Sequence, residues 1–441
     1  QTERHEFAKL IETETCRQLL RLFFSRERAR RLATWTPDAA RAIHHEPIRK
    51  LGVIGGGAMG AGIAQVAATK GYDVTVKELD LDTVRAGAQR IDHLMSNYSR
   101  HKGHRADEAE QLRKRIQVTN QSDAFVGSDC VVEAVVEKMS VKQVVLAEAE
   151  RHLCGTSILA TNTSALSVSE MATALERPRQ FAGLHFFNPV HRMELVEVVR
   201  GADTSDTTVA RLVAFVRSLG KTPIVTSDSP GFLVNRILFP YLGEAVLMVG
   251  EGGDVAEIDR EIRSFGMPMG PLELLDTVGL DVALHVAETL RPILSGVDDV
   301  VEVLTPLVAR RQAGLKSKRG FYDYRGKHKT PRTTAELVDF VADPPKAVDF
   351  ADDGLTTIQR RLIYPMLAEA IRCQEESVVA SAWAIDLGMV LGTGFAPHRG
   401  GPLSMIDQIG GDTVVTNLEQ LRSQFGNRFT PPRTLLTGAE Q

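Results

Sequence analysis

The chain has 441 residues, of which 43% are hydrophobic and 24% are charged, as in ordinary globular proteins with about three domains. Its 52 basic and 56 acidic residues give a formal net charge of −4, which excludes the strongly basic proteins that bind nucleic acid. No apolar run approaches the roughly 20 residues of a membrane-spanning helix, so no integral membrane segment is predicted.

Residues 1–47 are predicted to form a helical connector. The run Leu19–Phe24 would place an apolar stripe on one side of a helix, and we expect this stripe to pack on a neighbouring part. The chain begins at Gln1 rather than at methionine, so we expect it to be processed or to be a piece of a longer protein.

A glycine-rich turn follows the first predicted strand, Lys50–Ile54. Its sequence, GGGAMG, fits the GxGxxG pattern and leads directly into a predicted helix. In such turns the first glycine permits the tight bend, the second lets a pyrophosphate approach the backbone, and the third lets the helix pack on the strand. The turn therefore predicts dinucleotide binding by Gly55, Gly57 and Gly60, with Met59 between them.

The next predicted strand ends in the carboxylate of Glu78. This residue lies 23 positions after Gly55, where an acidic side chain holds the hydroxyls of the adenosine ribose. An acid at this place repels a 2′-phosphate, so the sequence favours NAD over NADP, although the neighbouring Lys77 weakens that preference.

A long helical stretch is predicted from Asp82 to Gln117, and its middle is basic. Residues Ser99–Arg105 carry this charge, including Arg100 and Lys102. Such a cluster is typical of a solvated helix end, and it also suits a grip on substrate phosphates. The sequence leaves both interpretations open.

Polar side chains gather at the ends of two further predicted strands, over residues 129–136 and 158–161. Three consecutive small polar residues after an apolar strand favour a site at that edge of the sheet. They are also favoured N-caps for the helix predicted over residues 165–175, and both roles can hold for different residues. The side chains concerned are Glu133, Glu137, Asn162, Thr163 and Ser164.

One histidine stands inside the apolar run Gly183–Val190, which closes on a proline. The run predicts a strand with His185 at its mouth, and Glu197 falls inside the next buried strand, Leu195–Val199. A carboxylate in such a strand is costly unless it is paired, and His185 is the nearest sensible partner. The alternative is a core histidine that bonds only to backbone.

Strands and helices alternate from residue 48 to residue 228, which predicts a mostly parallel sheet with helices on both faces. The sequence turns helical from Phe232, and Asn235 stands on an otherwise apolar helix face. The amide of Asn235 either bonds to backbone or contacts a substrate.

The helical part contains an internal repeat. The segment Arg236–Ala245 resembles Arg361–Ala370. Further along the chain there is a second pair of similar segments, one after Arg236–Ala245 and one after Arg361–Ala370. Two related all-α modules are therefore predicted. The second has Arg360 where the first has Asn235, so only the first is expected to work chemically. The predicted domains are a connector (1–47), an α/β Rossmann-type NAD-binding domain (48–228), a first helical copy (229–330), and a linker with a second copy (331–441).

With these motifs in place, the chain resembles the L-3-hydroxyacyl-CoA dehydrogenase family over residues 48–411. The doubled helical module and leading helix resemble multifunctional fatty-acid β-oxidation proteins, in which an enoyl-CoA hydratase domain precedes the dehydrogenase. We expect that hydratase region to be missing from this sequence. The motifs that match in order are Gly55–Gly60, Glu133–Glu137, Asn162–Ser164, His185–Pro189, Pro230–Asn235 and Met269–Pro271.

The resemblance implies a role for each matching residue. His185 would be the base, Glu197 its partner, and Ser164 and Asn235 would hold the substrate oxygens. Glu137 would lie near the nicotinamide ribose, and Arg100 and Lys102 near the CoA phosphates. Asn162 is expected among the cofactor-binding residues with the glycine turn. NAD is the expected cofactor, and no metal site is expected.

The expected reaction is the reversible NAD-dependent oxidation of a (3S)-3-hydroxyacyl-CoA to the 3-oxoacyl-CoA in β-oxidation. Expected partners are a hydratase domain or a thiolase subunit. Two alternatives are a scaffold subunit that kept the NAD fold, and a related β-hydroxyacid dehydrogenase, whose chemistry rests on a lysine. Four scattered cysteines without a CxxC pair favour a reducing compartment, so we expect a bacterial-type cytoplasmic location, with an organelle matrix as the alternative.

Overall fold

The computed structural model describes residues 8–38, 47–103, 105–338 and 349–438. Contacts divide the chain into two compact units, Arg26–Phe232 and Gln1–Ser25 together with Leu233–Gln441. The first contains the α/β region and the second contains the helical region. The finer domain boundaries expected at residues 47, 228 and 330 stay predictions.

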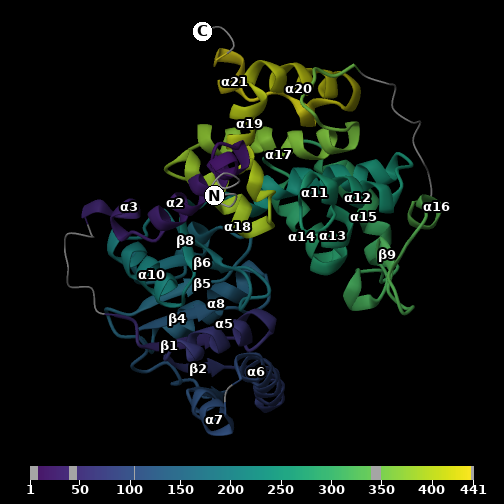
Figure 1. Cartoon of the computed structure of the whole chain (residues 1–441). Helices are drawn as coiled ribbons and strands as arrows, with labels where there is room; N and C mark the ends of the chain where they lie inside the picture. The colour runs from purple at the N-terminus through teal and green to yellow at the C-terminus, as the bar shows by residue number, and fades with distance from the viewer. Residues whose placement is uncertain (1–7, 39–46, 104, 339–348, 439–441) are drawn as a thin grey trace. The chain divides into compact units, whose positions relative to one another are not determined.

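Eight strands form the sheet of the α/β unit: β1 (Lys50–Ile54), β2 (Asp73–Lys77), β3 (Ile116–Thr119), β4 (Cys130–Glu133), β5 (Ile158–Thr161), β6 (Phe181–Phe186), β7 (Leu195–Arg200) and β8 (Thr222–Ser227). Their order is β3-β2-β1-β4-β5-β6-β7-β8 (Figure 1). Neighbouring strands run parallel except β6 and β7, which pair antiparallel. Parallel strands buried on both faces need continuous apolar runs, which β1 and β4 have.

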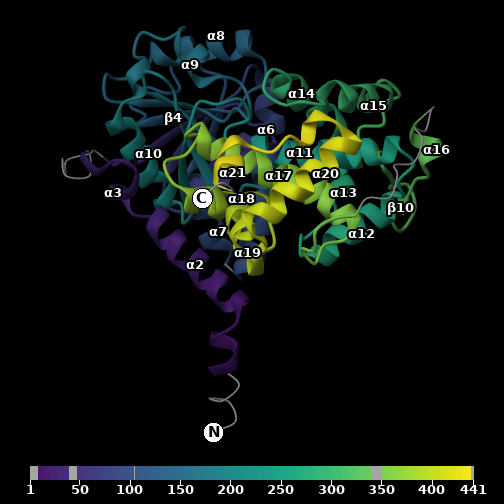
Figure 2. The same ribbon diagram turned by 90° about the horizontal axis from the view of Figure 1, so that it is seen from above.

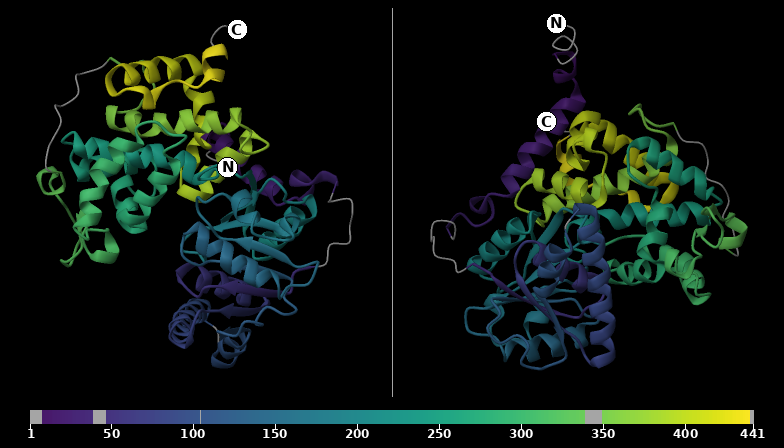
Figure 3. Two further views of the ribbon diagram at one scale, coloured as in Figure 1. Left: turned by 180° about the vertical axis from the view of Figure 1, so that it is seen from behind. Right: turned by 60° about the horizontal axis from the view of Figure 1, so that its bottom comes forward.

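Helices cover both faces of this sheet (Figure 3). They are α5 (Ala58–Thr69), α6 (Leu81–Lys102), α7 (Ala106–Lys114), α8 (Met139–Glu150), α9 (Val168–Ala172) and α10 (Asp206–Ser218). Side chains of a strand alternate between the faces, so Val132 of β4 joins the core under α5, α6 and α10, and Val131 joins the core under α8 and α9. The predicted doubly covered α/β sheet is confirmed.

The prediction of one continuous helical stretch from Asp82 to Gln117 is wrong. Gly103 ends α6 in a left-handed conformation (φ 68°), and α7 begins a few residues later. Glycine reaches this conformation without a Cβ clash, so it is a favoured helix stop. Strand β3 (Ile116–Thr119) then begins inside the stretch that was predicted to be helical.

The leading connector forms α2 (Glu14–Ala29) and the short α3 (Leu32–Trp35). The expectation that the stripe Leu19–Phe24 packs on a neighbouring part is wrong for most of its residues, although α2 buries one side, which carries Gln18, Leu22 and Ala29. Leu22 is buried, but Phe23 and Phe24 are 55% and 65% exposed. Leu19 and Leu20 are also exposed.

The helical unit contains α11 (Val234–Gly250), α12 (Val255–Phe265), α13 (Pro271–Val278), α14 (Leu280–Leu290), α15 (Val297–Ala309), α16 (Thr334–Leu337), α17 (Thr357–Glu375), α18 (Ala382–Thr393), α19 (Pro402–Ile409), α20 (Gly411–Phe425) and α21 (Arg433–Gly438). Helix α16 lies within the predicted linker that begins at residue 331, and just before it β10 (Thr330–Pro331) pairs with β9 (Tyr322–Asp323). In the described part of the chain, no helix is long and apolar enough to span a bilayer.

Reciprocal ion pairs join the two helical modules. Helices α11 and α17 lie side by side (Figures 1 and 2). Arg236 of α11 binds Glu369 of α17 at 2.7 Å, and Arg361 of α17 binds Glu244 of α11 through Nε at 2.8 Å. Each of these residues has its counterpart 125 positions along the chain, so the two contacts are equivalent. Such self-complementary exchange is the mark of a local twofold axis between the modules.

Each module also caps a short helix with a buried aspartate. Asp259 accepts hydrogen bonds from the backbone N–H groups of Leu272 and Glu273 at the start of α13. Asp386 accepts them from Leu403 and Ser404 at the start of α19. A carboxylate at a helix N-terminus satisfies otherwise unpaired donors and complements the helix dipole. The repeat seen in the sequence is therefore also a repeat of polar architecture.

Candidate active site

His185 and Glu197 face each other across the antiparallel pair of strands β6 and β7. Their register makes them direct partners, and His185 Nδ1 lies 2.7 Å from Glu197 Oε2. The Glu197 side chain is fully buried and that of His185 is 7% exposed. With Nδ1 held by the carboxylate, Nε2 is the ring nitrogen that can exchange a proton with a ligand. The aromatic rings of Phe187 and Phe232 flank the imidazole, with centroids 4.4 Å and 5.9 Å away.

The loop after β5 lies beside this pair. The side-chain oxygen of Asn162 accepts a hydrogen bond of 2.9 Å from the backbone N–H of Phe186, next to His185. Ser164 donates to Glu137 through its backbone N–H at 2.8 Å and through its hydroxyl at 3.2 Å. The longer hydroxyl contact is the one that a ligand can replace most easily.

The N-cap interpretation of this loop is wrong. Helix α9 begins at Val168, and its N-cap is Ser167, whose hydroxyl accepts from the N–H of Glu170. Thr163 instead donates to Glu137 at 2.6 Å and accepts from Leu166 N–H within the loop. Neither Asn162 nor Ser164 is the N-cap of α9.

A buried lysine, which the sequence reasoning missed, organises the acidic residues at this edge. Lys142 lies on α8, is 1% exposed, and binds both oxygens of Glu133, at 2.8 Å and 3.0 Å, and Glu137 at 3.1 Å. Burial acts to raise the pKa of Glu137, but Lys142, Thr163 and the backbone of Ser164 together hold it below its ordinary value. Two acids at the end of a strand, followed by a lysine on an otherwise apolar helix face, were the available signal.

Two further polar residues missed by the sequence reasoning hold neighbouring segments. Lys221 donates to the carbonyls of Val190 and Met193, in the turn that joins β6 to β7. Asp228, at the end of β8, accepts hydrogen bonds from the hydroxyl of Ser167 and from two backbone N–H groups at the start of α9. Both are positioning contacts that depend on tertiary proximity, so no sequence spacing predicts them.

The glycine turn has the geometry that a dinucleotide requires. Gly55 adopts φ +94°, and a Cβ at Gly60 would lie 1.8 Å from the carbonyl oxygen of Gly55. A Cβ at Gly57 would meet no atom within 4 Å, so space is open above the N-terminus of α5, where a phosphate binds best. Glu78 reaches the same turn and accepts a 2.6 Å hydrogen bond from Gly56 N–H. Met59 packs against the core under α5.

The basic residues at the end of α6 are exposed, as either interpretation of them requires. Arg100 and Lys102 occupy the last turn of α6. Burial first, and then the positive charges of Arg192, Lys221 and His101, lower the pKa of His191. The roles of Arg100 and Lys102 stay predictions.

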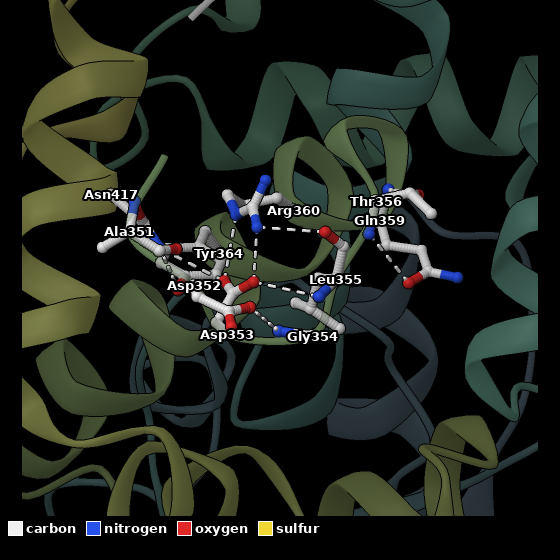
Figure 4. Close-up of polar contacts among 10 residues, drawn as sticks. All are labelled: Ala351, Asp352, Asp353, Gly354, Leu355, Thr356, Gln359, Arg360, Tyr364 and Asn417. Carbon is white, nitrogen blue, oxygen red and sulfur yellow. Dashed lines mark hydrogen bonds and ion pairs between the residues drawn. The ribbon is translucent and has the colours of Figure 1, made fainter. Parts of the chain in front are cut away.

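Asn235 belongs to the helical unit, where it is half-buried in the first turn of α11. Its counterpart in the second copy, Arg360, is closed in by its own module (Figure 4). Arg360 Nε binds the buried Asp353 at 3.0 Å, and Asp353 also accepts from Tyr364 and Asn417. Burial acts to raise the pKa of Asp353, but Arg360 and Tyr364 hold it below its ordinary value.

Comparison with known proteins identifies the family. Residues 50–229 match the NAD binding domain of 3-hydroxyacyl-CoA dehydrogenase, and residues 231–324 and 358–439 match the C-terminal domain of the same family. The crystal structure of (S)-3-hydroxybutyryl-CoA dehydrogenase PaaH1 from Ralstonia eutropha is 35% identical, with a TM-score of 0.59; the match covers 63% of this chain and 100% of that one. The chain belongs to the 3-hydroxyacyl-CoA dehydrogenase family.

Other relatives extend the match. 3-Hydroxybutyryl-CoA dehydrogenase from Escherichia coli K12 has a TM-score of 0.75 at 27% identity, over 90% of this chain and 99% of that one. The "fatty acid oxidation complex subunit alpha" of Acinetobacter baumannii is 34% identical over 98% of this chain. The chain spans 60% of the length of that relative.

The comparisons confirm the family, the fold class, NAD as the cofactor and the class of oxidoreductase. The roles of single residues stay predictions. Within the described residues, no group of three or more His, Cys, Asp or Glu side chains could hold a metal ion.

Proposed function

We propose that this chain catalyses the reversible NAD-dependent oxidation of a (3S)-3-hydroxyacyl-CoA to the 3-oxoacyl-CoA, as a step of fatty-acid β-oxidation. The observation that carries the proposal is the buried hydrogen bond between His185 and Glu197 at the edge of an NAD-binding sheet. Oxidation of a secondary alcohol needs a base for the hydroxyl proton, and a histidine suits that task near neutral pH.

In this mechanism His185 Nε2 accepts the hydroxyl proton of the substrate. Glu197 holds the ring through Nδ1, keeps the acceptor tautomer in place and stabilises the imidazolium that forms. Ser164 and Asn235 donate hydrogen bonds to the reacting oxygen and stabilise charge that develops there. NAD, when bound, supplies the hydride acceptor.

The glycine turn is proposed to hold the cofactor, with Gly55, Gly57, Gly60 and Met59 around the pyrophosphate and Glu78 on the adenosine ribose. Glu137 and Asn162 would act at the nicotinamide end; Asn162 accepts a hydrogen bond from the backbone of Phe186, next to His185, and Glu137 binds the neighbouring Thr163. The exposed Arg100 and Lys102 are proposed to contact the CoA phosphates.

The partner and the location are also proposals. Relatives named as the alpha subunit of a fatty acid oxidation complex support a hydratase domain and a thiolase subunit as partners. We propose a bacterial-type cytoplasmic location, in keeping with the bacterial source of these relatives.

The direct test is NADH oxidation with acetoacetyl-CoA, with a long-chain 3-oxoacyl-CoA and with free acetoacetate. We expect turnover with the CoA esters only, and a His185→Gln variant that binds NADH normally but loses about 10²–10⁴-fold in kcat. Equal turnover in that variant would refute His185 as the base. Bound NADH without turnover on any substrate would favour the scaffold alternative.

A further inference from the structure

A cavity of about 560 Å³ lies between the two helical modules, inside the helical unit. Its lining includes Pro240 and Glu244 of α11 and their counterparts Pro365 and Glu369 of α17, each 125 residues later. The cavity therefore lies on the local twofold axis. Its volume falls within the range of sites that take small molecules. We call it the axial pocket.

The two walls of the axial pocket differ in chemistry. The first module contributes apolar side chains, among them Leu247, Val297 and Val300. The second contributes guanidinium groups, and Arg372 stands at the position that corresponds to Leu247. The backbones of the two modules are thus related by the twofold axis, but the charges on the two walls of the pocket are not. An apolar wall opposite a cationic wall suits a ligand with a hydrocarbon part and an anionic head.

The acidic residues in the lining do not oppose an anion. The side chains of Glu244 and Glu369 are 1% exposed, and each is already bound by an arginine of the opposite helix. Arg428 adds a second cation to Glu244, and Arg372 adds a second cation to Glu369. Buried carboxylates in this state are compensated and present little negative potential to the cavity.

Arg422 is the cation best placed to exchange partners. It lines the pocket, and its ion pair with Glu419, at 3.1 Å, is a surface pair with side chains 42% and 40% exposed. Exposed pairs of this kind contribute about 0–1 kcal/mol, so a ligand carboxylate can replace Glu419 at little cost.

Two glycines of the lining lie close to other residues of the cavity. Gly243 and Gly296 line it, and a Cβ at these positions would lie 3.1 Å from Val300 and 3.2 Å from Arg428. Those contacts are tighter than ordinary van der Waals packing, so a side chain at either position would press on the lining.

We propose that the axial pocket binds an aliphatic carboxylate, a fatty-acid anion. Its chain packs on Leu247, Val297 and Val300, and its carboxylate binds Arg422. Because the ligand contacts both modules, it stabilises their packing through mass action on the folded state. The site is separate from the residues that the proposed reaction uses and does not depend on that reaction.

The test is calorimetric titration of the whole chain with decanoate, with decanol as the uncharged analogue. We expect one decanoate per chain, at least tenfold weaker binding of decanol, and a rise in Tm with decanoate. Saturating NADH and acetoacetyl-CoA leave decanoate binding unchanged. Displacement by acetoacetyl-CoA, or no binding at millimolar decanoate, would overturn the proposal.

Two variants and two matched controls locate the binding. Arg422→Glu reverses the charge at the proposed head group, and Ile293→Glu puts a negative charge on an exposed apolar residue of the lining. Each substitution should weaken the binding of decanoate at least tenfold. As controls, Arg260→Glu breaks a comparable exposed pair with Glu257, and Leu436→Glu changes an exposed apolar residue outside the lining. Neither control should change the binding of decanoate.

The outcomes are distinct from those of the reaction test. Normal decanoate binding by Arg422→Glu overturns the proposal, whether or not the chain oxidises hydroxyacyl-CoA. Equal weakening by Arg260→Glu would show a general charge effect and overturn it as well.

Discussion

The two helical modules share a backbone plan but differ at the one position where chemistry is expected. Asn235 in the first module and Arg360 in the second occupy equivalent places on α11 and α17. Arg360 is bound in an internal hydrogen-bond network with Asp353, Tyr364 and Asn417, as Figure 4 shows. Asp353 itself corresponds to Asp228, which holds the start of α9 instead.

This difference shows how a duplicated module changes its task. The framework of the repeat, which comprises the reciprocal arginine–glutamate pairs and the capping aspartates, is kept in both copies. The side chain that would face a substrate in one copy serves internal packing in the other. Substitutions at equivalent positions should therefore separate loss of activity from loss of stability.

The largest contrast is expected at Asn235. Asn235→Ala should lower kcat by about 10²–10³-fold with acetoacetyl-CoA, the usual loss when one donor to a developing oxyanion is removed. Urea unfolding should be nearly unchanged. A normal kcat in this variant would show that the amide of Asn235 serves only the helix.

The equivalent change in the second module should act in the opposite way. Arg360→Met leaves Asp353 buried without its cation, which should lower the free energy of unfolding by about 3–5 kcal/mol. The kcat at a temperature where the variant is folded should match that of the unchanged chain. A selective loss of kcat would mean that the second module also contributes to the reaction.

The capping aspartate of the second module should make the stability of the chain depend on pH. Burial raises the pKa of Asp386 to about 6, above its ordinary value of 3.8, so the folded state binds the proton more tightly than the unfolded state. The associated stability is complete at acid pH and is lost as pH rises through about 6. Relative to Asp386→Asn, the unchanged chain should lose about 3 kcal/mol between pH 3.5 and pH 7. Parallel unfolding curves at all pH values would contradict the shift.

The smallest contrast concerns the outer ends of the reciprocal ion pairs. Glu376 is 55% exposed, and its counterpart Glu251 is 21% exposed and also faces Arg428. Glu376→Gln should cost about 0–1 kcal/mol, and Glu251→Gln about 1.5–3 kcal/mol, in urea unfolding. Equal costs would mean that burial does not distinguish these two ends.

Local patterns predicted most of the α/β unit. The glycine turn, the strand that ends at Glu78 and the His185–Glu197 strands were predictable, because period and glycine placement act over short stretches. The break at Gly103 was misjudged because the flanking residues are all compatible with one long helix. Packing of the connector stripe was misjudged because an apolar helix face does not say what covers it.

The sequence by itself determined the cofactor turn, the alternation of strands and helices, the repeat and the family, since each depends on residue types at fixed spacing. Only the tertiary structure decided that β7 runs antiparallel to β6, which sets Glu197 opposite His185. It alone placed Lys142 between two acids and Arg360 on Asp353. Those contacts join residues from different elements, and the burial that makes a charge need its partner exists only once the chain has folded.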